Sequence, residues 1–337
     1  MKKVNKIRLN ANENYKPLEE NIITNLFSTI EKIELNRYPD TDGKELREAY
    51  AAYAGVKREN IILGNGSDEM LSLAISKNIS KGEKIFTLDP DFSMYDFYVS
   101  LKEGEVVKYK FNPKEELNID NFISEGLKSK AKLIIFSNPN NPTGYGFKIS
   151  HIKKILEAFK DKTVLVDEAY YEFYGESAIE LINEYKNLIV TRTLSKAWGL
   201  AALRVGFLIS NEESIRELMN YKVPYNVNSI SQALAAKVIR NWKELKKRVE
   251  VIVKEREKLY KNLLEIQKES SLKIKFYPSK ANYIFGETDH KDILIRALEE
   301  AGIIIRDFNK DNTFRITVAS SLENEKVVEV IRRTFLK

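Results

Sequence analysis

The central part of the chain alternates short apolar runs with amphipathic stretches. The apolar runs are rich in β-branched side chains and lie at 61–63, 84–88, 106–109, 133–136, 164–166, 188–191 and 204–209. Continuous runs of this kind are typical of strands that are buried on both faces of a sheet. Helical patterns lie between them, for example over 67–77, over 95–102 and over 150–159 with Ser150 as its N-cap. The alternation predicts right-handed crossovers and a doubly wound, mostly parallel α/β sheet.

The pattern changes after about residue 228. Residues 231–267 form one long charged helical pattern without Gly or Pro, and its apolar positions lie near one face: Leu245, Val249, Ile252 and Leu259. Beyond it, four strand-like runs (272–277, 282–285, 303–306 and 314–318) surround a helical pattern over 291–301. We therefore expect a smaller α+β domain that the long helix connects to the first. The predicted large domain spans residues 36–235, and the small domain combines residues 1–35 and 236–337.

Composition removes several classes of function. The 337 residues contain no cysteine and two histidines, which excludes disulfides and thiolate nucleophiles and argues against a His-ligated metal centre. The net charge of +6 comes from interspersed charges, so a nucleic-acid-binding surface is not expected. No apolar run approaches the length of a membrane span, and residues 1–12 do not form a signal peptide. We expect a cytoplasmic enzyme or binding protein without metal, nucleic-acid or membrane partners.

Two loops that follow predicted strands contain residues suited to an anion and to a rigid cleft. Residues 64–69, Gly-Asn-Gly-Ser-Asp-Glu, open a predicted helix, whose free backbone N–H groups and dipole can bind a phosphate. A tight turn followed by an N-cap explains the same residues equally simply. Residues 137–144, Ser-Asn-Pro-Asn-Asn-Pro-Thr-Gly, fix an irregular backbone that can aim an amide into a cleft, or form an ordinary surface turn.

Two further strand ends carry an acid and an amine. Asp167 ends the run 164–166, and Tyr170 shares its face if a helical turn follows; an N-cap aspartate is the alternative. Lys196 follows the next run together with hydroxyl side chains, and Arg204 comes eight residues later. A lysine in such a cleft can act as a nucleophile, whereas one lysine among so many is normally a solvated surface residue.

Taken together, the four strand ends predict one shared ligand site, because ligands of doubly wound sheets bind outside the carboxyl ends of the strands. An anion site, an amide, an acid with a phenol, and a lysine with an arginine would then meet at one edge of the sheet. Pyridoxal phosphate needs this set: an amine for covalent attachment, a carboxylate for the ring nitrogen, donors for the ring oxygen and cations for the phosphate.

At these residues the chain resembles the fold-type-I pyridoxal-phosphate aminotransferases and, within them, the histidinol-phosphate aminotransferase group. Four motifs occur in the family's order: Asn-Pro-Thr-Gly at 141–144, Asp-Glu-Ala-Tyr at 167–170, Ser-Lys at 195–196 and Leu-Arg-Val-Gly at 203–206. Residues 9–13, 37–39 and 64–68 are also similar to the family. The resemblance covers nearly the whole chain and implies the fold-type-I large domain with its smaller α+β domain.

The resemblance implies roles for the cofactor side. Lys196 would bind pyridoxal 5'-phosphate covalently and later move the substrate proton, while Asp167 would keep the pyridine nitrogen protonated. Tyr170 and Asn141 would donate to the ring oxygen, and Phe92 would stack on the ring where the family usually has a tyrosine. Residues of three loops, and a tyrosine of a second copy of the chain, would hold the phosphate: Gly66, Ser67, Asp68, Thr193, Ser195, Arg204 and Tyr38 of the partner subunit.

The resemblance also implies the substrate side and the reaction. Arg315 would grip a carboxylate or phosphate by a bidentate pair, Arg306 would add a second cation or else be a surface charge, and Asn12 would lie near the acidic group. A homodimer would then transfer an amino group between histidinol phosphate and the 2-oxo acid 2-oxoglutarate. The family usually has a tyrosine before the segment 9–13, and this chain has none there. The alternatives are therefore a same-fold aminotransferase or decarboxylase for another phosphorylated, phosphono- or aromatic amino acid, and, less favoured, a cofactor-bound regulator without activity.

Overall fold

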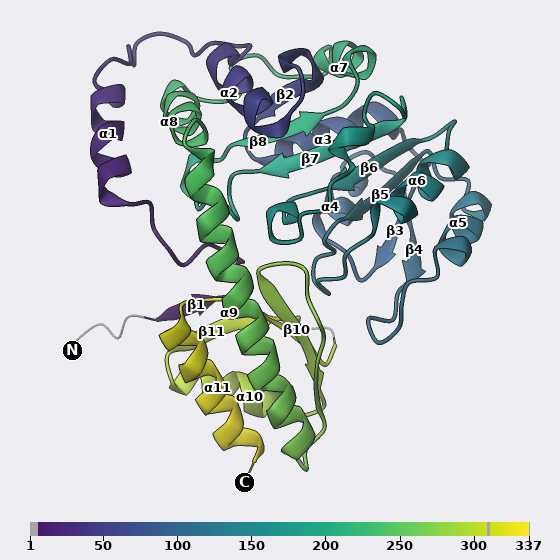
Figure 1. Cartoon of the computed structure of the whole chain (residues 1–337). Coiled ribbons are helices and arrows are strands. Elements are labelled where there is room, and N and C mark those ends of the chain that lie inside the picture. Colours follow the sequence, from purple (N-terminus) through teal and green to yellow (C-terminus); the bar gives the residue numbers. More distant parts are fainter. Residues whose placement is uncertain (1–5, 309–310, 337) are drawn as a thin grey trace.

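The computed structural model describes residues 6–308 and 311–336, and their strands form two sheets (Figure 1). The larger sheet has the order β2-β8-β7-β6-β5-β3-β4. Its strands are β2 (Ile61–Gly64), β3 (Lys84–Asp89), β4 (Glu105–Lys110), β5 (Leu133–Ser137), β6 (Thr163–Asp167), β7 (Leu188–Thr193) and β8 (Gly206–Ile209). Only β8 runs antiparallel to its neighbours, β2 and β7, among the strands that the structure describes in this sheet. The predicted doubly wound, mostly parallel sheet is confirmed.

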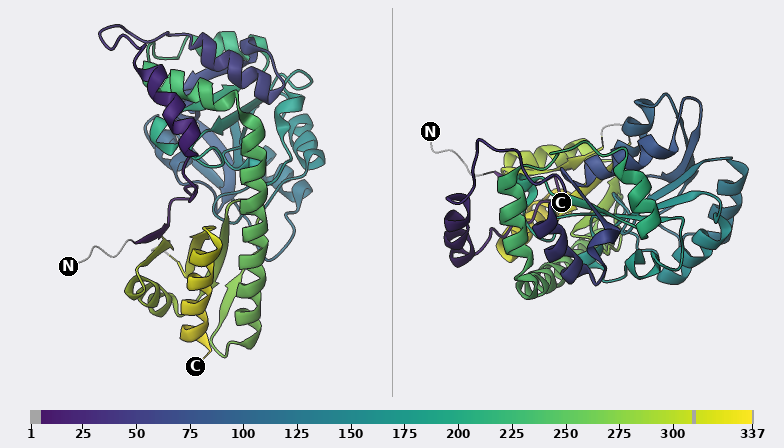
Figure 2. Two further views of the ribbon diagram at one scale, coloured as in Figure 1. Left: turned by 60° about the vertical axis from the view of Figure 1, so that its left-hand side comes forward. Right: turned by 90° about the horizontal axis from the view of Figure 1, so that it is seen from above.

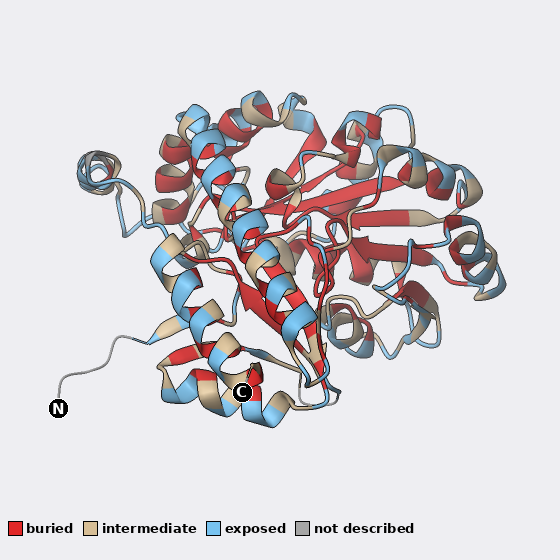
Figure 3. Cartoon of the chain, turned by 60° about the horizontal axis from the view of Figure 1, so that its bottom comes forward, coloured by how far each residue is buried: buried red, intermediate tan, exposed pale blue. Residues whose placement is uncertain are grey.

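Helices cover both faces of this sheet. Neighbouring residues of each strand point to opposite faces, so each strand contributes apolar side chains to the layer on either side. Ile134 and Phe136 of β5 belong to one apolar cluster, and Leu133 and Ile135 belong to the other. The first cluster contains residues of α2 (Lys44–Ala54), α5 (Ile119–Lys128), α6 (Ile149–Ala158) and α8 (Ser229–Ile239). The second contains residues of α3 (Ser67–Asn78), α4 (Met94–Ser100) and α7 (Glu212–Met219). Figure 3 shows the resulting layer of buried strands between half-exposed helices.

The smaller sheet has the order β1-β11-β12-β10-β9 and draws on both ends of the chain. Its strands are β1 (Ile7–Leu9), β9 (Ile274–Phe276), β10 (Tyr283–Thr288), β11 (Ile303–Asp307) and β12 (Thr313–Thr317). The helices of this part are α9 (Trp242–Glu269), α10 (Lys291–Glu300) and α11 (Ser321–Phe335). Since β1 pairs in parallel with β11, the N-terminal segment joins the C-terminal third, as the predicted domains require. The exact domain boundaries stay a prediction, and residues 1–5, 309–310 and 337 lie outside the described part.

The prediction of a single helix over 231–267 is wrong. The structure has two helices, because α8 ends at Ile239 and α9 begins only at Trp242. Asn241 leaves helical geometry with φ −101° and ψ 30°, and its amide donates to the Lys237 carbonyl at 3.2 Å. Asparagine side chains compete for backbone groups in this way, so a helix can break without Gly or Pro. The longer helix α9 extends from the larger part of the molecule along the smaller one (Figure 2).

Two secondary-structure elements also begin at other residues than the sequence pattern predicts. Helix α6 begins at Ile149 after Lys148 as its N-cap, so Ser150 lies in the first turn and caps nothing. Strand β8 begins at Gly206 and not at Arg204, which adopts a left-handed backbone with φ 51°. The remaining short elements are α1 (Glu20–Ile30), η1 (Arg58–Asn60), η2 (Tyr171–Phe173), η3 (Ala178–Leu181) and η4 (Ala201–Leu203). No helix within the described ranges is long and apolar enough to cross a membrane.

Candidate active site

A cavity of about 110 Å³ lies at the carboxyl ends of β5, β6 and β7. It is lined by Ser67, Asp68, Phe92, Ser137, Asn141, Asp167, Ala169, Tyr170, Thr193, Ser195, Lys196 and Arg204. The structure therefore brings together every residue expected on the cofactor side except Gly66, which lies just behind the cavity wall, and Tyr38. Ser137 and Ala169 line the cavity without having been predicted.

The acid of the cavity is a buried carboxylate that accepts hydrogen bonds from hydroxyl groups. Asp167 ends β6 and is 3% exposed. The Tyr95 hydroxyl donates to its Oδ2 at 3.0 Å, and the Thr191 hydroxyl donates to its Oδ1 at 3.1 Å. Burial raises the pKa of Asp167 to about 6, and no ion pair within the described residues offsets this effect. A ligand that brings a positive charge would relieve this cost.

The amine and the phenol lie on the same side of the cavity. The Lys196 Nζ donates to the carbonyl of Ala11 at 2.9 Å and lies 5.8 Å from the centre of the Tyr170 ring. The Tyr170 hydroxyl accepts a hydrogen bond from the Asn12 amide at 2.9 Å. The N-terminal segment therefore contacts both groups, and Asn12 lies beside Tyr170; its role near the acidic end of a substrate stays a prediction.

The start of α3 and the turn before β8 together form an anion cradle, defined here as Gly66, Ser67, Ser195 and Arg204. No side chain caps the first turn of α3, so its backbone N–H groups can serve a ligand. The Arg204 guanidinium donates to Ser195 Oγ and to Asp68 Oδ2, both at 3.2 Å. A Cβ at Gly66, which has φ 81°, would lie 2.7 Å from Arg204 Nη2. Glycine at this position is therefore what allows the arginine to approach the helix start.

The loop after β5 presents an amide. Asn141 is 8% exposed, and its backbone N–H donates to Ser137 Oγ at 2.9 Å. Its side-chain Oδ1 accepts a close hydrogen bond from Arg315. Its Nδ2 group has no acceptor among the residues that the structure describes, so it is the atom left to donate to a ligand.

The two arginines expected on the substrate side differ in burial. Arg315 on β12 is buried, and its Nη2 donates to the Asn10 carbonyl at 3.0 Å. Its Nε is a buried donor without a partner in the described part of the chain, and its guanidinium lies 5.0 Å from the Tyr283 ring centre. Arg306 lies directly opposite Arg315 in the register of β11 and β12, but it is exposed and lies 5.7 Å from the Phe308 ring centre. Arg315 therefore adjoins the cavity through Asn141, whereas Arg306 lies on the surface beside it.

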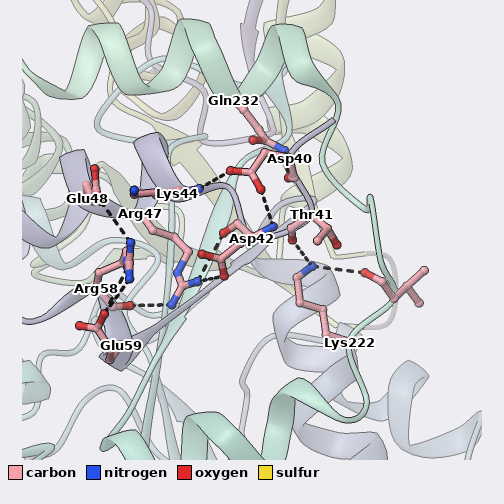
Figure 4. A network of polar contacts seen from close by, with 11 residues as sticks. Asp40, Thr41, Asp42, Lys44, Arg47, Glu48, Arg58, Glu59, Lys222 and Gln232 are labelled. Carbon is pink, nitrogen blue, oxygen red and sulfur yellow. Dashed lines mark hydrogen bonds and ion pairs between the residues drawn. The ribbon is translucent and has the colours of Figure 1, made fainter. Parts of the chain in front are cut away.

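Tyr38 lies outside the cavity of its own chain. It is 81% exposed, and its ring stacks on Tyr225 with centres 4.7 Å apart. The loop that follows it is held by polar contacts (Figure 4): Gln232 donates to the Asp40 carbonyl at 2.9 Å, and Lys222 donates to the Thr41 carbonyl at 3.1 Å. The tyrosine is thus presented outward from a fixed loop.

Three residues that hold the site were not predicted as site residues: Tyr95, Ser137 and Thr191. Thr191 pairs directly with Asp167 in the register of β6 and β7, so a hydroxyl at the matching end of the neighbouring strand was a usable signal. Tyr95 has no such signal, because α4 and its turn bring the phenol to Asp167 across 72 residues.

Comparisons with known proteins agree with this geometry. The model of the family described as aminotransferase class I and II matches residues 4–333. The histidinol-phosphate aminotransferase of Thermoanaerobacter pseudethanolicus is 40% identical over 333 residues, covering 98% of this chain and 93% of the relative. That of Clostridium novyi is 39% identical over 330 residues, covering 97% and 91%. The crystal structure of histidinol-phosphate aminotransferase from Sinorhizobium meliloti in complex with pyridoxal-5'-phosphate superposes with a TM-score of 0.86 at 22% identity, covering 97% and 91%. The chain belongs to the family of class I and II aminotransferases.

Proposed function

We propose that the protein uses pyridoxal 5'-phosphate to transfer an amino group between histidinol phosphate and 2-oxoglutarate. The observation that carries this proposal is the shared cavity, which holds a lysine amine, an uncompensated buried acid and an anion cradle. The choice of substrate rests on the relatives at 39–40% identity, which are named histidinol-phosphate aminotransferases. A cytoplasmic location stays a prediction.

The residues present fit the cofactor. The raised pKa of Asp167 reports a buried carboxylate that lacks a counter-charge, and a protonated ring nitrogen supplies that charge. The anion cradle offers helix N–H groups and a guanidinium to a phosphate, and Asn141 Nδ2 is free to donate to a ring oxygen. When bound, the cofactor supplies an electron-withdrawing ring that stabilises negative charge at the substrate Cα.

The chain's own residues would position and deprotonate the substrate. Lys196 would be the base at the substrate Cα, because an amine can lose and regain a proton, whereas the other cation lining the cavity, the Arg204 guanidinium, stays protonated. Asp167 keeps a proton on the ring nitrogen, and Tyr170 and Asn141 hold the ring oxygen. Phe92 provides the apolar face against which the ring packs.

Arg315 and Arg306 would bind the acidic end of the substrate. Two guanidiniums at paired positions of β11 and β12 suit a phosphate, and Arg315 with its unpaired Nε suits a carboxylate as well. This arrangement lets histidinol phosphate and 2-oxoglutarate use one site in turn. Asn12 completes the wall through its contact with Tyr170.

The active unit would be a homodimer. Large apolar side chains are exposed on α1 and on the loops near Tyr38: Phe27 at 63%, Leu35 at 76% and Val223 at 63%. Helix α1 lies at the edge of the molecule, where it packs against α8 through buried Leu26 and leaves Phe27 exposed (Figure 2). A second copy that covered this surface would bring Tyr38 of the partner subunit to the phosphate end of the cavity.

The test is a spectrum followed by turnover. Apoprotein mixed with pyridoxal 5'-phosphate should develop a visible absorbance band that borohydride fixes to the protein. Candidate amines are then added one at a time with 2-oxoglutarate: histidinol phosphate, threonine phosphate and aromatic amino acids. Glutamate formation with histidinol phosphate is the expected result. Turnover of another amine alone, or loss of CO₂, would replace the substrate or the reaction type but keep the class.

A further inference from the structure

An acid that does not line the cavity stands directly behind its wall. Asp91 lies in the turn between β3 and α4, next to Phe92. Its Oδ1 accepts a close hydrogen bond from the Ser137 hydroxyl, and its Oδ2 accepts from the Ser137 backbone N–H at 3.2 Å. Both oxygens of the carboxyl group therefore bind Ser137, the last residue of β5, and Oδ1 also accepts the backbone N–H of Phe92 at 2.8 Å.

Ser137 in turn binds the loop after β5, which carries the Asn141 amide. Its Oγ accepts the backbone N–H of Asn141 at 2.9 Å. A serine hydroxyl has one hydrogen, and here it is given to Asp91, so the oxygen lone pairs are directed toward Asn141. The chain of hydrogen bonds has one direction: from Asn141 to Ser137 to Asp91. Without an acceptor at residue 91, the hydroxyl could rotate and lose this direction.

A second contact braces the same turn against the same loop. The Asn140 amide donates to the Pro90 carbonyl at 3.3 Å, and the Tyr283 hydroxyl donates to the Asn140 carbonyl at 2.7 Å. The turn that carries Phe92 and the loop that carries Asn141 are thus fixed to each other. These are the two segments that would contact the cofactor ring on its face and at its oxygen.

We propose that Asp91 is a positioning residue, which acts through Ser137 to hold the Asn141 amide toward the ring oxygen of the cofactor. This inference rests on the proposed function. An acid here is costly, since burial and, to a smaller extent, the charge of nearby Asp167 raise the pKa of Asp91 to about 8. The hydrogen bonds to Ser137 and the brace between the two segments are what assign the positioning role.

The experiment measures the pH midpoint of the visible absorbance of the bound cofactor. A donor to the ring oxygen favours the ionised form of that oxygen, so its loss moves the midpoint upward. Asn141→Ala sets the reference shift. Asp91→Ala and Ser137→Ala should each move the midpoint upward by roughly half to one unit, the size of one neutral hydrogen bond. The double variant Asp91→Ala/Asn141→Ala should move it no further than Asn141→Ala alone.

Two variants separate positioning from general damage. Asp91→Asn keeps an acceptor for the Ser137 hydroxyl and should retain most of the wild-type midpoint. Asp96→Ala removes an exposed acid of the same segment, paired with Lys108 at 2.6 Å, and should change nothing. Melting of each apoprotein checks the fold, and Ser137→Ala carries the test if Asp91→Ala does not fold. Additive shifts in the double variant, or an unmoved midpoint in both well-folded single variants, would overturn the inference. A wild-type protein that develops no absorbance band would instead refute the proposed function itself.

Discussion

The two sides of the cavity carry buried charges of opposite sign. On the cofactor side Asp167 is held by two hydroxyl donors, and burial raises its pKa to about 6. On the substrate side Arg315 is buried beside Tyr283, and burial lowers its pKa. Neither group has an oppositely charged partner among the described residues. Each side therefore lacks the charge that its proposed ligand brings: a cationic ring nitrogen on one side and an acidic substrate on the other.

Both sides also leave polar groups without a partner among the described residues. On the cofactor side, Asn141 Nδ2 has no acceptor and Asp167 has no ion pair. On the substrate side, Arg315 Nε is a buried donor without a partner. Unpaired buried groups are costly, so a ligand that satisfies them gains affinity. Each side therefore lacks hydrogen-bond or charge partners that its proposed ligand would supply.

The largest effect is expected from removing the amine. Lys196→Ala should lower turnover roughly 10⁴-fold or more and abolish borohydride trapping of the cofactor, because the proposed nucleophile and base is lost. Absorbance and steady-state assays measure both. Lys186→Ala, which removes a surface lysine paired with Glu213, is the matched control and should behave as wild type. Normal turnover in Lys196→Ala would remove the lysine from the mechanism.

The buried carboxyl group of Asp167 should make the stability of the apoprotein depend on pH. A carboxyl group with a folded pKa near 6 and an unfolded pKa of 3.8 keeps its proton longer in the folded state. The contribution of Asp167 to the stability of the apoprotein therefore falls by about 3 kcal/mol as pH rises from about 4 to 6 and is constant above that range. Asp167→Asn removes this change, so urea unfolding at a series of pH values should show the variant gaining on wild type across that interval. Parallel curves for the two proteins would contradict the uncompensated acid.

On the substrate side, Arg315→Lys should raise the KM for both glutamate and histidinol phosphate by about 10- to 100-fold. A lysine has no planar fork with which to bind Asn141, the Asn10 carbonyl and a ligand together. Steady-state kinetics and the cofactor spectrum are measured together. The cofactor should stay bound, and loss of cofactor in this variant would show that the two sides are not separable.

The smallest effect is expected at the surface. Arg306→Ala should raise the KM for histidinol phosphate about two- to fivefold, since an exposed charge contributes little in water. The KM for glutamate should change less, because a carboxylate carries less charge than a phosphate. Equal effects on both substrates would remove the phosphate preference assigned to Arg306.

Much of the site could be predicted because its parts lie at strand ends. The apolar runs before Asp167 and Lys196 place both residues at the same edge of a parallel sheet, whatever the loops do. The supporting residues could not be found in this way. Tyr95 reaches Asp167 from a helix 72 residues earlier, and Ser137 is held by Asp91 across 46 residues. Such contacts depend on helix packing and turn geometry, and no local pattern records them.

The helix break at Asn241 and the left-handed turn at Arg204 illustrate the same limit on a smaller scale. Neither residue type by itself marks a break or a left-handed turn in the sequence pattern, and the contact of Asn241 is a local one with the Lys237 carbonyl. The Arg204 turn directs the guanidinium to Ser195 and Asp68.

Local sequence determined the order of strands and helices, the edge at which chemistry gathers and the kinds of groups found there, because periodicity and strand ends are properties of short segments. Tertiary structure alone decided which of those groups meet. Arg315 contacts Asn141 across 174 residues, and Asn12 contacts Tyr170 across 158. These pairs depend on how the larger and smaller parts of the molecule are placed relative to each other, since hydrogen bonds over such separations form only after the chain has folded.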